Sequence, residues 1–312
     1  MSALPPDAAE PMPAGAAWTR RPERSNLAML RLMTWLSLRL GRRASRPILA
    51  LVSLYFLLFA AGARRASRDY LSRVLGRRPG LAELFRHFHG FATTVHDRVY
   101  LLNDRFDLFD IELEGETAFD EVLAAGRGAF LMGAHLGSFE VVRAVGRSRR
   151  GLRVAMVMYE ENARKINAAL QAINPAAGQD IIPLGKLDSM LQVRDRLDEG
   201  VAIGVLADRT PGDEAVLTVP FLGADAAFPL GPMRLAAMLK RPVLFMAGLH
   251  LGGNRYVIRF EPIADFSETG PQQRDAAVKD AVAAYAACLE RHCRAQPYNW
   301  FNFFDFWPTR LD

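Results

Sequence analysis

Cysteine is nearly absent from this sequence of 312 residues, which has only Cys288 and Cys293, five positions apart in an expected helix. A scaffold held together by disulfides is therefore excluded, and a reducing compartment is the default expectation. Long hydrophobic runs are absent as well. The apolar run 47–63 has seventeen residues, which is the lower limit for crossing a bilayer.

The sequence also lacks the motifs of several enzyme classes. It has no Gly-x-Ser-x-Gly elbow of a serine hydrolase, since Ser138 is followed by Phe139 and Glu140. Neither a Walker loop nor a Gly-x-Gly-x-x-Gly sequence follows an expected strand. Three histidines lie within the stretch 87–96, but their spacing from the two cysteines does not suit zinc. We therefore expect neither a metal nor a cofactor.

Lysine is missing from the first 90 residues, which contain fifteen arginines and five acidic residues. This segment carries a charge of about +10, and because the net charge of the chain is +5, the rest is acidic. A basic arm beside an acidic body suggests an anionic partner: a membrane, a nucleic acid or an acidic protein. The plainer alternative is a solvated, arginine-rich face.

The arginines of the basic arm alternate with large apolar residues, as in LRLMTWLSLRLGRR at 30–43. Such a mixture suits lipid head groups better than nucleic acid, and we expect no nucleic acid partner. The apolar run 47–63 has arginines on both flanks and could cross the bilayer, lie in its interface or form a buried helix. We expect membrane contact here, and a disordered, Pro/Ala-rich segment at 1–19.

The pattern after the basic arm predicts an α/β fold. Residues 25–102 have a helical pattern with breaks near Gly41, Gly62 and Pro79-Gly80. Buried strands then alternate with helices, which indicates a largely parallel central sheet flanked by helices. We expect a helical, membrane-associating region at 20–105 and an α/β domain at 106–312. The expected strands are 108–113, 128–134, 152–159, 179–184, 201–208, 241–251 and 255–263, and the expected helices are 117–126, 139–147, 162–173, 187–200, 229–240 and 272–294.

The stretch LMGAHLGSFE, Leu131 to Glu140, joins an expected strand to an expected helix through His135. A histidine at the carboxyl end of a strand can act as a general base in acyl transfer, with a carboxylate such as Glu140 fixing its tautomer. The small residues Gly137 and Ser138 would leave room for substrate and offer N–H groups to an oxyanion. In the alternative, Glu140 favours the positive end of the helix, Ser138 caps it and His135 is a core residue.

Four sequence blocks in order resemble one family. The sequence AHLGSFE at 134–140 resembles the His-x4-Asp/Glu motif of the lysophospholipid acyltransferase superfamily, in the branch of bacterial late lipid A acyltransferases. LADRTPGD at 206–213, VPFLG at 219–223 and FPLGPMRLAAMLKRPVLF at 228–245 are similar to further blocks of that branch. The resemblance implies a glycerol-3-phosphate acyltransferase-like fold, with His135 as general base and Glu140 as its orienting partner.

The resemblance also implies substrates. The donor would be an acyl carrier protein or acyl-CoA thioester, and the acceptor a hydroxyl or amine of a lipid-like molecule. Gly137, Ser138, Arg164, Asp208 and Arg209 are the expected substrate-binding residues. Arg209 could instead form a structural ion pair with Asp208 or with the acid at 213.

Three departures from the branch bear on the acceptor. Acids come first after the strand 152–159, with Arg164 as the nearest arginine; ADR replaces the commoner Asp-Gln; and the stretch 298–307 carries seven aromatic residues. These features indicate an acceptor other than lipid A, and ADR with the aromatic ending is similar to predicted acyltransferases linked to aryl polyene lipids. The aromatic stretch itself could be a buried terminal segment, an interfacial belt or the wall of an acyl groove.

The sequence thus predicts a membrane-associated acyltransferase at the cytoplasmic face of the inner membrane, bound peripherally or by a single pass. The alternative is a catalytically silent membrane adaptor that binds acyl carrier or lipid.

Overall fold

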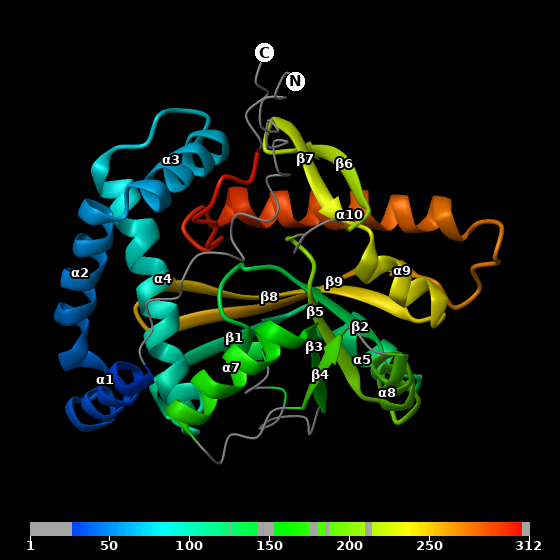
Figure 1. Cartoon of the computed structure of the whole chain (residues 1–312), viewed down its shortest axis with the longest axis horizontal. Helices are drawn as coiled ribbons and strands as arrows, with labels where there is room; N and C mark the ends of the chain where they lie inside the picture. Colours follow the sequence, from blue (N-terminus) through cyan, green and yellow to red (C-terminus); the bar gives the residue numbers. More distant parts are fainter. Residues whose placement is uncertain are drawn as a thin grey trace, which may run out of the picture.

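A computed structural model of the chain describes residues 27–124, 126–142, 146, 153–174, 180–184, 187–209 and 214–307. The segment 1–19, expected to be disordered, and the acid at 213 lie outside the described residues. The centre of the molecule is a seven-stranded sheet in the order β1-β9-β8-β2-β5-β3-β4 (Figure 1). Its strands are β1 (Asp110–Glu114), β2 (Phe130–Gly133), β3 (Val154–Tyr159), β4 (Ile181–Leu184), β5 (Ala202–Leu206), β8 (Pro242–Gly252) and β9 (Arg255–Asp265).

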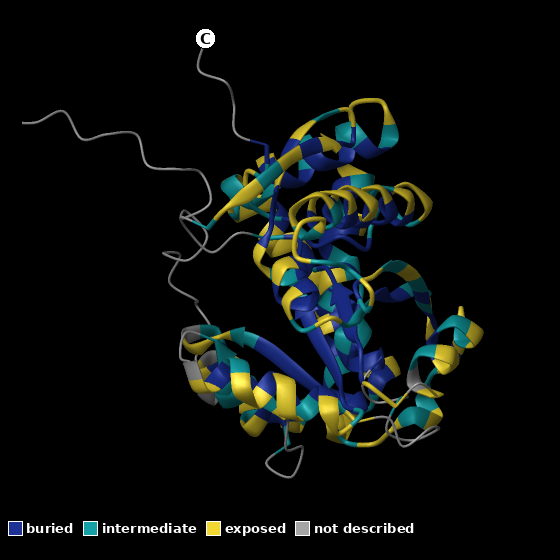
Figure 2. Ribbon diagram, turned by 90° about the vertical axis from the view of Figure 1, so that its right-hand side faces the viewer, coloured by how far each residue is buried: buried dark blue, intermediate teal, exposed yellow. Residues whose placement is uncertain are grey.

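The sheet is mostly parallel, as the sequence predicts. Strands β8, β2, β5, β3 and β4 run in one direction, while β9 is antiparallel to β8 and β1 is parallel to β9. All residues of β2 are buried, because helices cover both faces of a parallel sheet. The side chains of Phe130 and Met132 pack on one face, and that of Leu131 packs on the other. Figure 2 shows this concentration of buried residues in the strands.

Helices flank the sheet on both faces. On the face of Phe130 the core includes Val282 and Leu289 of the long helix α10, and on the face of Leu131 it includes Phe119 of α5. Each of these helices follows a break rich in glycine, proline or polar residues, as expected for connections at the surface. The flanking helices are α5 (Glu116–Ala124), α7 (Glu160–Ile173), α8 (Leu187–Asp198), α9 (Gly231–Met238) and α10 (Arg274–Ala295).

In the part of the chain that the structure describes, the helices before the sheet are α1 (Leu27–Leu40), α2 (Arg42–Phe59), α3 (Ala61–Leu75) and α4 (Leu81–Leu101), and a short 3-10 turn, η2 (Phe106–Leu108), leads into β1. The predicted break at Gly41 is present, whereas the break predicted near Gly62 occurs at Ala60. The reason lies in Arg64, whose side chain donates hydrogen bonds to the carbonyl groups of Leu57 and Leu58 and so caps the end of α2.

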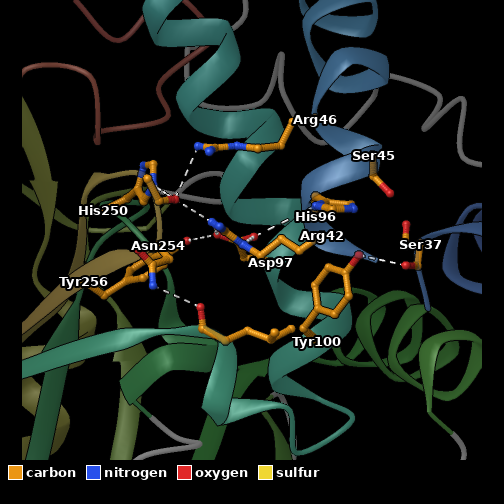
Figure 3. Close-up of polar contacts among 12 residues, drawn as sticks. Ser37, Arg42, Ser45, Arg46, His96, Asp97, Tyr100, His250, Asn254 and Tyr256 are labelled. Atoms are coloured by element: carbon orange, nitrogen blue, oxygen red, sulfur yellow. Dashed lines mark hydrogen bonds and ion pairs between the residues drawn. The ribbon is translucent and has the colours of Figure 1, made fainter. Parts of the chain in front are cut away.

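A buried ion pair fastens these helices to the sheet (Figure 3). The guanidinium of Arg42, at the start of α2, donates two hydrogen bonds of 2.7 and 2.8 Å to the carboxylate of Asp97 on α4. The Tyr256 hydroxyl of β9 donates a third to the same carboxylate at 2.7 Å, and Arg42 also bonds the Gly253 carbonyl at 2.6 Å. Arg42 thus belongs to the interior, although its sequence context suggested a head-group contact.

The apolar side chains of α2 divide between the interior and the surface. Leu49 and Leu57 are buried, whereas Leu51 and Phe59 are about 70 % exposed. Taken singly, none of the described helices has the length and apolar character that a membrane crossing requires, but α2 and α3 meet that test together as a pair bent by 95°.

An antiparallel hairpin, β6 (Val216–Phe221) and β7 (Ala224–Pro229), was not predicted from the sequence. Its two-residue turn, Leu222-Gly223, has positive φ at both positions, 50° and 81°. Such turns favour Asn-Gly or Asp-Gly, so with leucine at the first turn position the sequence does not indicate a hairpin. Here the Leu222 N–H donates to the Glu290 carboxylate of α10 at 2.7 Å, which stabilises the turn.

Candidate active site

His135 and Asp208 come together because they follow two neighbouring parallel strands. Gly133 of β2 is in register with Leu206 of β5, and the Ala207 N–H donates to the Gly133 carbonyl at 3.0 Å. Each residue therefore lies two positions beyond a paired position, at the same edge of the sheet. The predicted parallel arrangement of the sheet is confirmed for these two strands, and it places their carboxyl ends on the same side.

The two side chains are in direct contact. His135 Nδ1 lies 2.9 Å from Asp208 Oδ1, and the His135 backbone N–H donates to Asp208 Oδ2 at 3.0 Å. The carboxylate is fully buried, whereas a third of the His135 side chain is exposed. Because an ionised carboxylate only accepts hydrogen bonds, the Nδ1 of a neutral ring must carry the proton. The lone pair of Nε2 is then free to take a proton from a substrate.

The surroundings favour the ionised carboxylate and the neutral ring. Burial alone would raise the pKa of Asp208, but the neighbouring His135, Arg209 and the Trp300 indole lower that pKa well below its ordinary value. Burial, followed by the charge of Arg209, lowers the pKa of His135 below 6.5, against the opposing effect of Asp208. A neutral imidazole at neutral pH is the form that a general base requires.

Glu140 occupies a different position from the one predicted. Its carboxylate forms an ion pair with Arg98 of α4, with Arg98 Nε 2.9 Å from Glu140 Oε1, and accepts a hydrogen bond from the Ser138 hydroxyl at 3.5 Å. In the described part of the chain, the carboxylate on the His135 ring is that of Asp208. The expectation of a His135–Glu140 contact is therefore corrected. Glu140 lies in the helical turn that follows the His135 loop, where Arg98 of α4 supplies a cation.

Gly137 and Ser138 build the loop that carries His135. Gly137 has a φ of 71°, and a Cβ atom there would lie 2.0 Å from the Gly248 carbonyl oxygen, so only glycine fits. The Ser138 hydroxyl accepts a hydrogen bond from the Val141 N–H at 3.4 Å and caps the following helix. The N–H groups of Gly137 and Ser138 donate to the carbonyls of Asn299 and Gly248, so they are not the free oxyanion donors that the sequence suggested.

The aromatic stretch near residue 300 forms part of the site. The Trp300 indole Nε1–H donates to Asp208 Oδ2 at 3.0 Å, and the Phe301 N–H donates to the His135 carbonyl at 2.8 Å. Trp300 is fully buried. Of the three alternatives for this stretch, the buried segment is the correct one for residues 299–302. Sequence reasoning missed Trp300, and the available signal was that a buried indole N–H usually has a partner.

The two predicted substrate-binding arginines differ in their surroundings. Arg209 lies beside the His135–Asp208 pair, donates to the Phe301 carbonyl at 2.9 Å and stacks on the Phe304 ring at 4.8 Å. Burial lowers the pKa of Arg209 to about 10. Arg164 lies exposed on α7, which begins at the carboxyl end of β3.

A group of potential metal ligands lies elsewhere, on β9 and α10. Oxygen, sulfur and nitrogen atoms of Glu261, Cys288 and His292 lie within 4.8 Å of one another. The Glu261 carboxylate is already paired with Arg291 and His292, both at 2.6 Å. Burial raises the pKa of the Cys288 thiol to about 12, so the thiolate that binds zinc is disfavoured. These contacts form a polar network between β9 and α10.

Comparison with known proteins identifies the family. A search of curated proteins found no significant match. A family model described as bacterial lipid A biosynthesis acyltransferase matches residues 18–309, which include the His135 loop, Asp208 and the aromatic stretch. The resemblance inferred from four sequence blocks is thereby confirmed. The chain belongs to the bacterial lipid A biosynthesis acyltransferase family, within the lysophospholipid acyltransferase superfamily, whose members are lipid-related acyltransferases.

Proposed function

We propose that this acyltransferase moves an acyl chain from the thioester of acyl carrier protein or coenzyme A to a hydroxyl or amine of a membrane lipid, with His135 as general base. The observation that carries the proposal is the 2.9 Å contact between His135 Nδ1 and the buried Asp208 carboxylate. This contact orients the ring and leaves the lone pair of Nε2 to act as base, on a side chain that is one third exposed.

The proposed reaction needs no covalent enzyme intermediate. Nε2 of His135 takes the proton of the acceptor hydroxyl or amine as that group attacks the thioester carbonyl carbon. Asp208 stabilises the imidazolium that forms. The tetrahedral intermediate then collapses, the C–S bond breaks, and the thiolate leaves with the proton held on Nε2. The acyl group ends on the acceptor, and the base returns to its neutral form.

Arg209 is proposed to bind an anionic group of the donor or acceptor. Its guanidinium makes one hydrogen bond to the Phe301 carbonyl, and its Nε is buried with no partner among the described residues. Burial disfavours the charged form, so an added anion would be bound strongly. Phosphate-containing donors and lipid head groups both supply such an anion.

The outer surface of α1 and α2 is proposed to dock on the anionic cytoplasmic leaflet of the inner membrane. Large apolar side chains with exposed fractions of 37–72 % cover these helices, and arginines lie between them. A basic, apolar helix surface is typical of interfacial membrane binding. The exposed residues are Leu32, Trp35, Leu38, Leu40, Ile48, Leu51, Leu54, Tyr55, Phe56, Leu58 and Phe59.

The proposal is tested by incubating the detergent-solubilised protein with isotope-labelled long-chain acyl carrier protein and a total bacterial lipid extract. Mass spectrometry then identifies the labelled lipid. We expect a labelled product with the wild type and with His89→Gln, which alters a histidine outside the pair, but none with His135→Ala or Asp208→Asn. Full turnover by His135→Ala would overturn the assignment of the base. Lipid binding without transfer by the wild type would support the adaptor instead.

A further inference from the structure

Trp300 is the third partner of the His135–Asp208 pair. We infer that Trp300 is a positioning residue, whose indole N–H locks the Asp208 carboxylate in the orientation that holds His135 ready to act as base. This inference rests on the proposed function. The carboxylate has its two oxygens in different roles: Oδ1 faces His135 Nδ1 at 2.9 Å, while Oδ2 accepts from the His135 backbone N–H and from Trp300 Nε1–H, both at 3.0 Å.

The Trp300 indole is the hydrogen-bond donor to Asp208 that does not belong to the His135 loop. Without it, the hydrogen bonds that Asp208 accepts from the described residues would both come from His135, and the loop and carboxylate could turn together. With it, Oδ2 is fixed to a side chain that comes from beyond α10, and rotation about the Cβ–Cγ bond of Asp208 would break three hydrogen bonds in place of two. A catalytic group is oriented well only when a second set of contacts holds its partner.

Trp300 is itself held firmly, which it must be to position another residue. Its side chain is completely buried, with the Tyr70 ring at 4.9 Å and the Phe221 ring at 5.4 Å, both edge-on. His87 Nε2 donates to the Trp300 carbonyl at 2.8 Å, and Ser67 lies 2.8 Å from the other ring nitrogen of His87. The indole is therefore fixed from both its ring and its backbone.

The same backbone also holds the histidine loop. The residue before Trp300, Asn299, accepts from the Gly137 N–H at 2.8 Å, and the residue after it, Phe301, donates to the His135 carbonyl at 2.8 Å. The segment 299–301 thus contacts both members of the pair, His135 through the backbone and Asp208 through the indole. Loss of the indole N–H alone removes only the second contact.

Removal of the Trp300 N–H should shift the pKa values of Asp208 and His135 in a defined direction. The hydrogen bond from Trp300 lowers the pKa of Asp208, so its loss makes the carboxylate more basic. A more basic carboxylate stabilises the imidazolium more strongly, and the pKa of His135 then rises. A tryptophan that only filled space would leave this pKa unchanged.

The test compares Trp300→Phe with Trp307→Phe. Trp307 belongs to the same aromatic cluster, with its ring centroid 6.1 Å from that of Trp300, and its indole nitrogen is buried without a partner in the described part of the chain. Both substitutions remove a buried indole, but only one removes a hydrogen bond to Asp208. Replacement of Trp300 by 3-benzothienylalanine, which has sulfur in place of the N–H in a ring of the same shape, covers the case in which Trp300→Phe does not fold.

Two readouts are measured on each protein: the pKa of His135, from NMR of the imidazole nitrogens, and kcat and KM for a long-chain acyl carrier protein thioester. We expect loss of the Trp300 N–H to raise the His135 pKa by roughly half a pH unit or more. We expect kcat to fall roughly 10- to 100-fold with little change in KM. Trp307→Phe should change neither quantity, even if it lowers the melting temperature.

Folded Trp300 variants with the wild-type His135 pKa and kcat would overturn the inference, while an inactive His135→Ala in the same assay would keep the proposed base intact. Equal changes in both tryptophan variants would also overturn it, because packing alone would then explain them. The NMR readout does not use a substrate, so the inference about Trp300 is decided even if the assay substrate is wrong.

Discussion

Two charges of opposite sign near His135 act on its proton in opposite directions. Asp208 stabilises the imidazolium and Arg209 destabilises it, and together with burial the balance lowers the pKa of His135. The neutral form that the proposed base requires is therefore present above the lowered pKa of His135 and is lost as the pH falls through that pKa. We expect the acid limb of the pH profile of kcat/KM to lie below pH 6.5, the ordinary value for histidine.

Arg209→Gln tests the contribution of the cation to this limb. Loss of the positive charge removes a factor that lowers the pKa of His135, so the acid limb should move to higher pH. Because the proposed anion-binding group is also lost, kcat/KM should fall by a factor that corresponds to about 2–4 kcal/mol of activation free energy. Arg209→Lys is the control. It keeps the positive charge, so the acid limb should stay at the same pH, and it should mainly raise KM. An unmoved limb in Arg209→Gln would contradict the electrostatic role.

Asp208 and Glu140 are both acidic residues near His135, and the structure gives them different contacts. Asp208→Asn should lower kcat by a factor on the order of 10⁴, as loss of the orienting carboxylate does in serine protease triads. Glu140→Gln should lower kcat far less. It should lower the free energy of unfolding by about 1 kcal/mol, because it breaks the partly exposed ion pair with Arg98. Activity assays and urea unfolding of the two variants separate these outcomes.

A double-mutant cycle of Glu140→Gln with Arg98→Gln checks the second assignment. The two stability losses should not add, since either substitution breaks the same ion pair. If Glu140→Gln instead abolishes turnover at full stability, Glu140 acts in the chemistry in spite of its contact with Arg98.

Helix α4 joins the N-terminal helices to the rest of the molecule through two adjacent residues. Asp97 holds Arg42 of α2 and Tyr256 of β9, and Arg98 holds Glu140 beside the His135 loop. The first pair is buried, with side-chain exposures of 8 % and 1 %, so its partners depend on one another. Removal of one member leaves an uncompensated charge in the interior.

Asp97→Asn should therefore lower the free energy of unfolding by about 3–5 kcal/mol. The matched control is Arg255→Gln, which breaks the exposed pair with Glu112 on neighbouring strands and should cost less than about 1 kcal/mol. Urea unfolding followed by circular dichroism measures both. Equal effects in the two variants would show that Arg42 is solvated or paired elsewhere when Asp97 is neutral.

The elements that the sequence predicted well are the buried parallel strands. Runs such as GAFLMGA and VAIGVLAD are apolar on both faces, and this pattern locates β2 and β5 and the polar residues that end them. The partner of His135 was harder to find. Local spacing favoured Glu140, whereas the contact is made by Asp208, which lies 73 residues further along the chain. Only the register of β2 against β5 reveals it.

The unpredicted parts have physical reasons too. The β6–β7 hairpin turns at Leu222, and a leucine at positive φ is uncommon enough to conceal the turn. Trp300 touches Asp208 from 92 residues away, in a segment without regular secondary structure and hence without periodicity. Such contacts depend on tertiary packing, which hydrophobic patterns do not encode.

For the whole molecule, the apolar surface of α2 and the active site are predicted to act together at the membrane. The combined variant Leu51→Ser/Phe59→Ser removes two side chains that are 68 and 72 % exposed, so it should fold normally. We expect it to lose most of its binding to vesicles of anionic phospholipid in a flotation assay. Raised salt should weaken the arginine contribution, about 1 kcal/mol per residue, and leave the apolar part.

The matched control for membrane binding is Leu191→Ser on α8, a leucine that is 46 % exposed away from the N-terminal helices. It should float with vesicles like the wild type. Full binding by the α2 variant would move the contact to another part of the surface. Substitution is preferable to deletion, because Leu57 of α2 packs in the main core.

The order in which the chain is synthesised gives the segment around Trp300 a further consequence. His135 is synthesised before Asp208. Neither residue makes its contacts with the segment 299–301 until Pro297 to Phe301 have been synthesised and have packed against Tyr70 and His87. Helices α1 and α2, whose outer surface we propose faces the membrane, are synthesised before His135 and Asp208. If α1 and α2 bind the bilayer as proposed, a nascent chain can reach it before the proposed active site is assembled, and a protein truncated before residue 300 should bind membranes without acyltransferase activity.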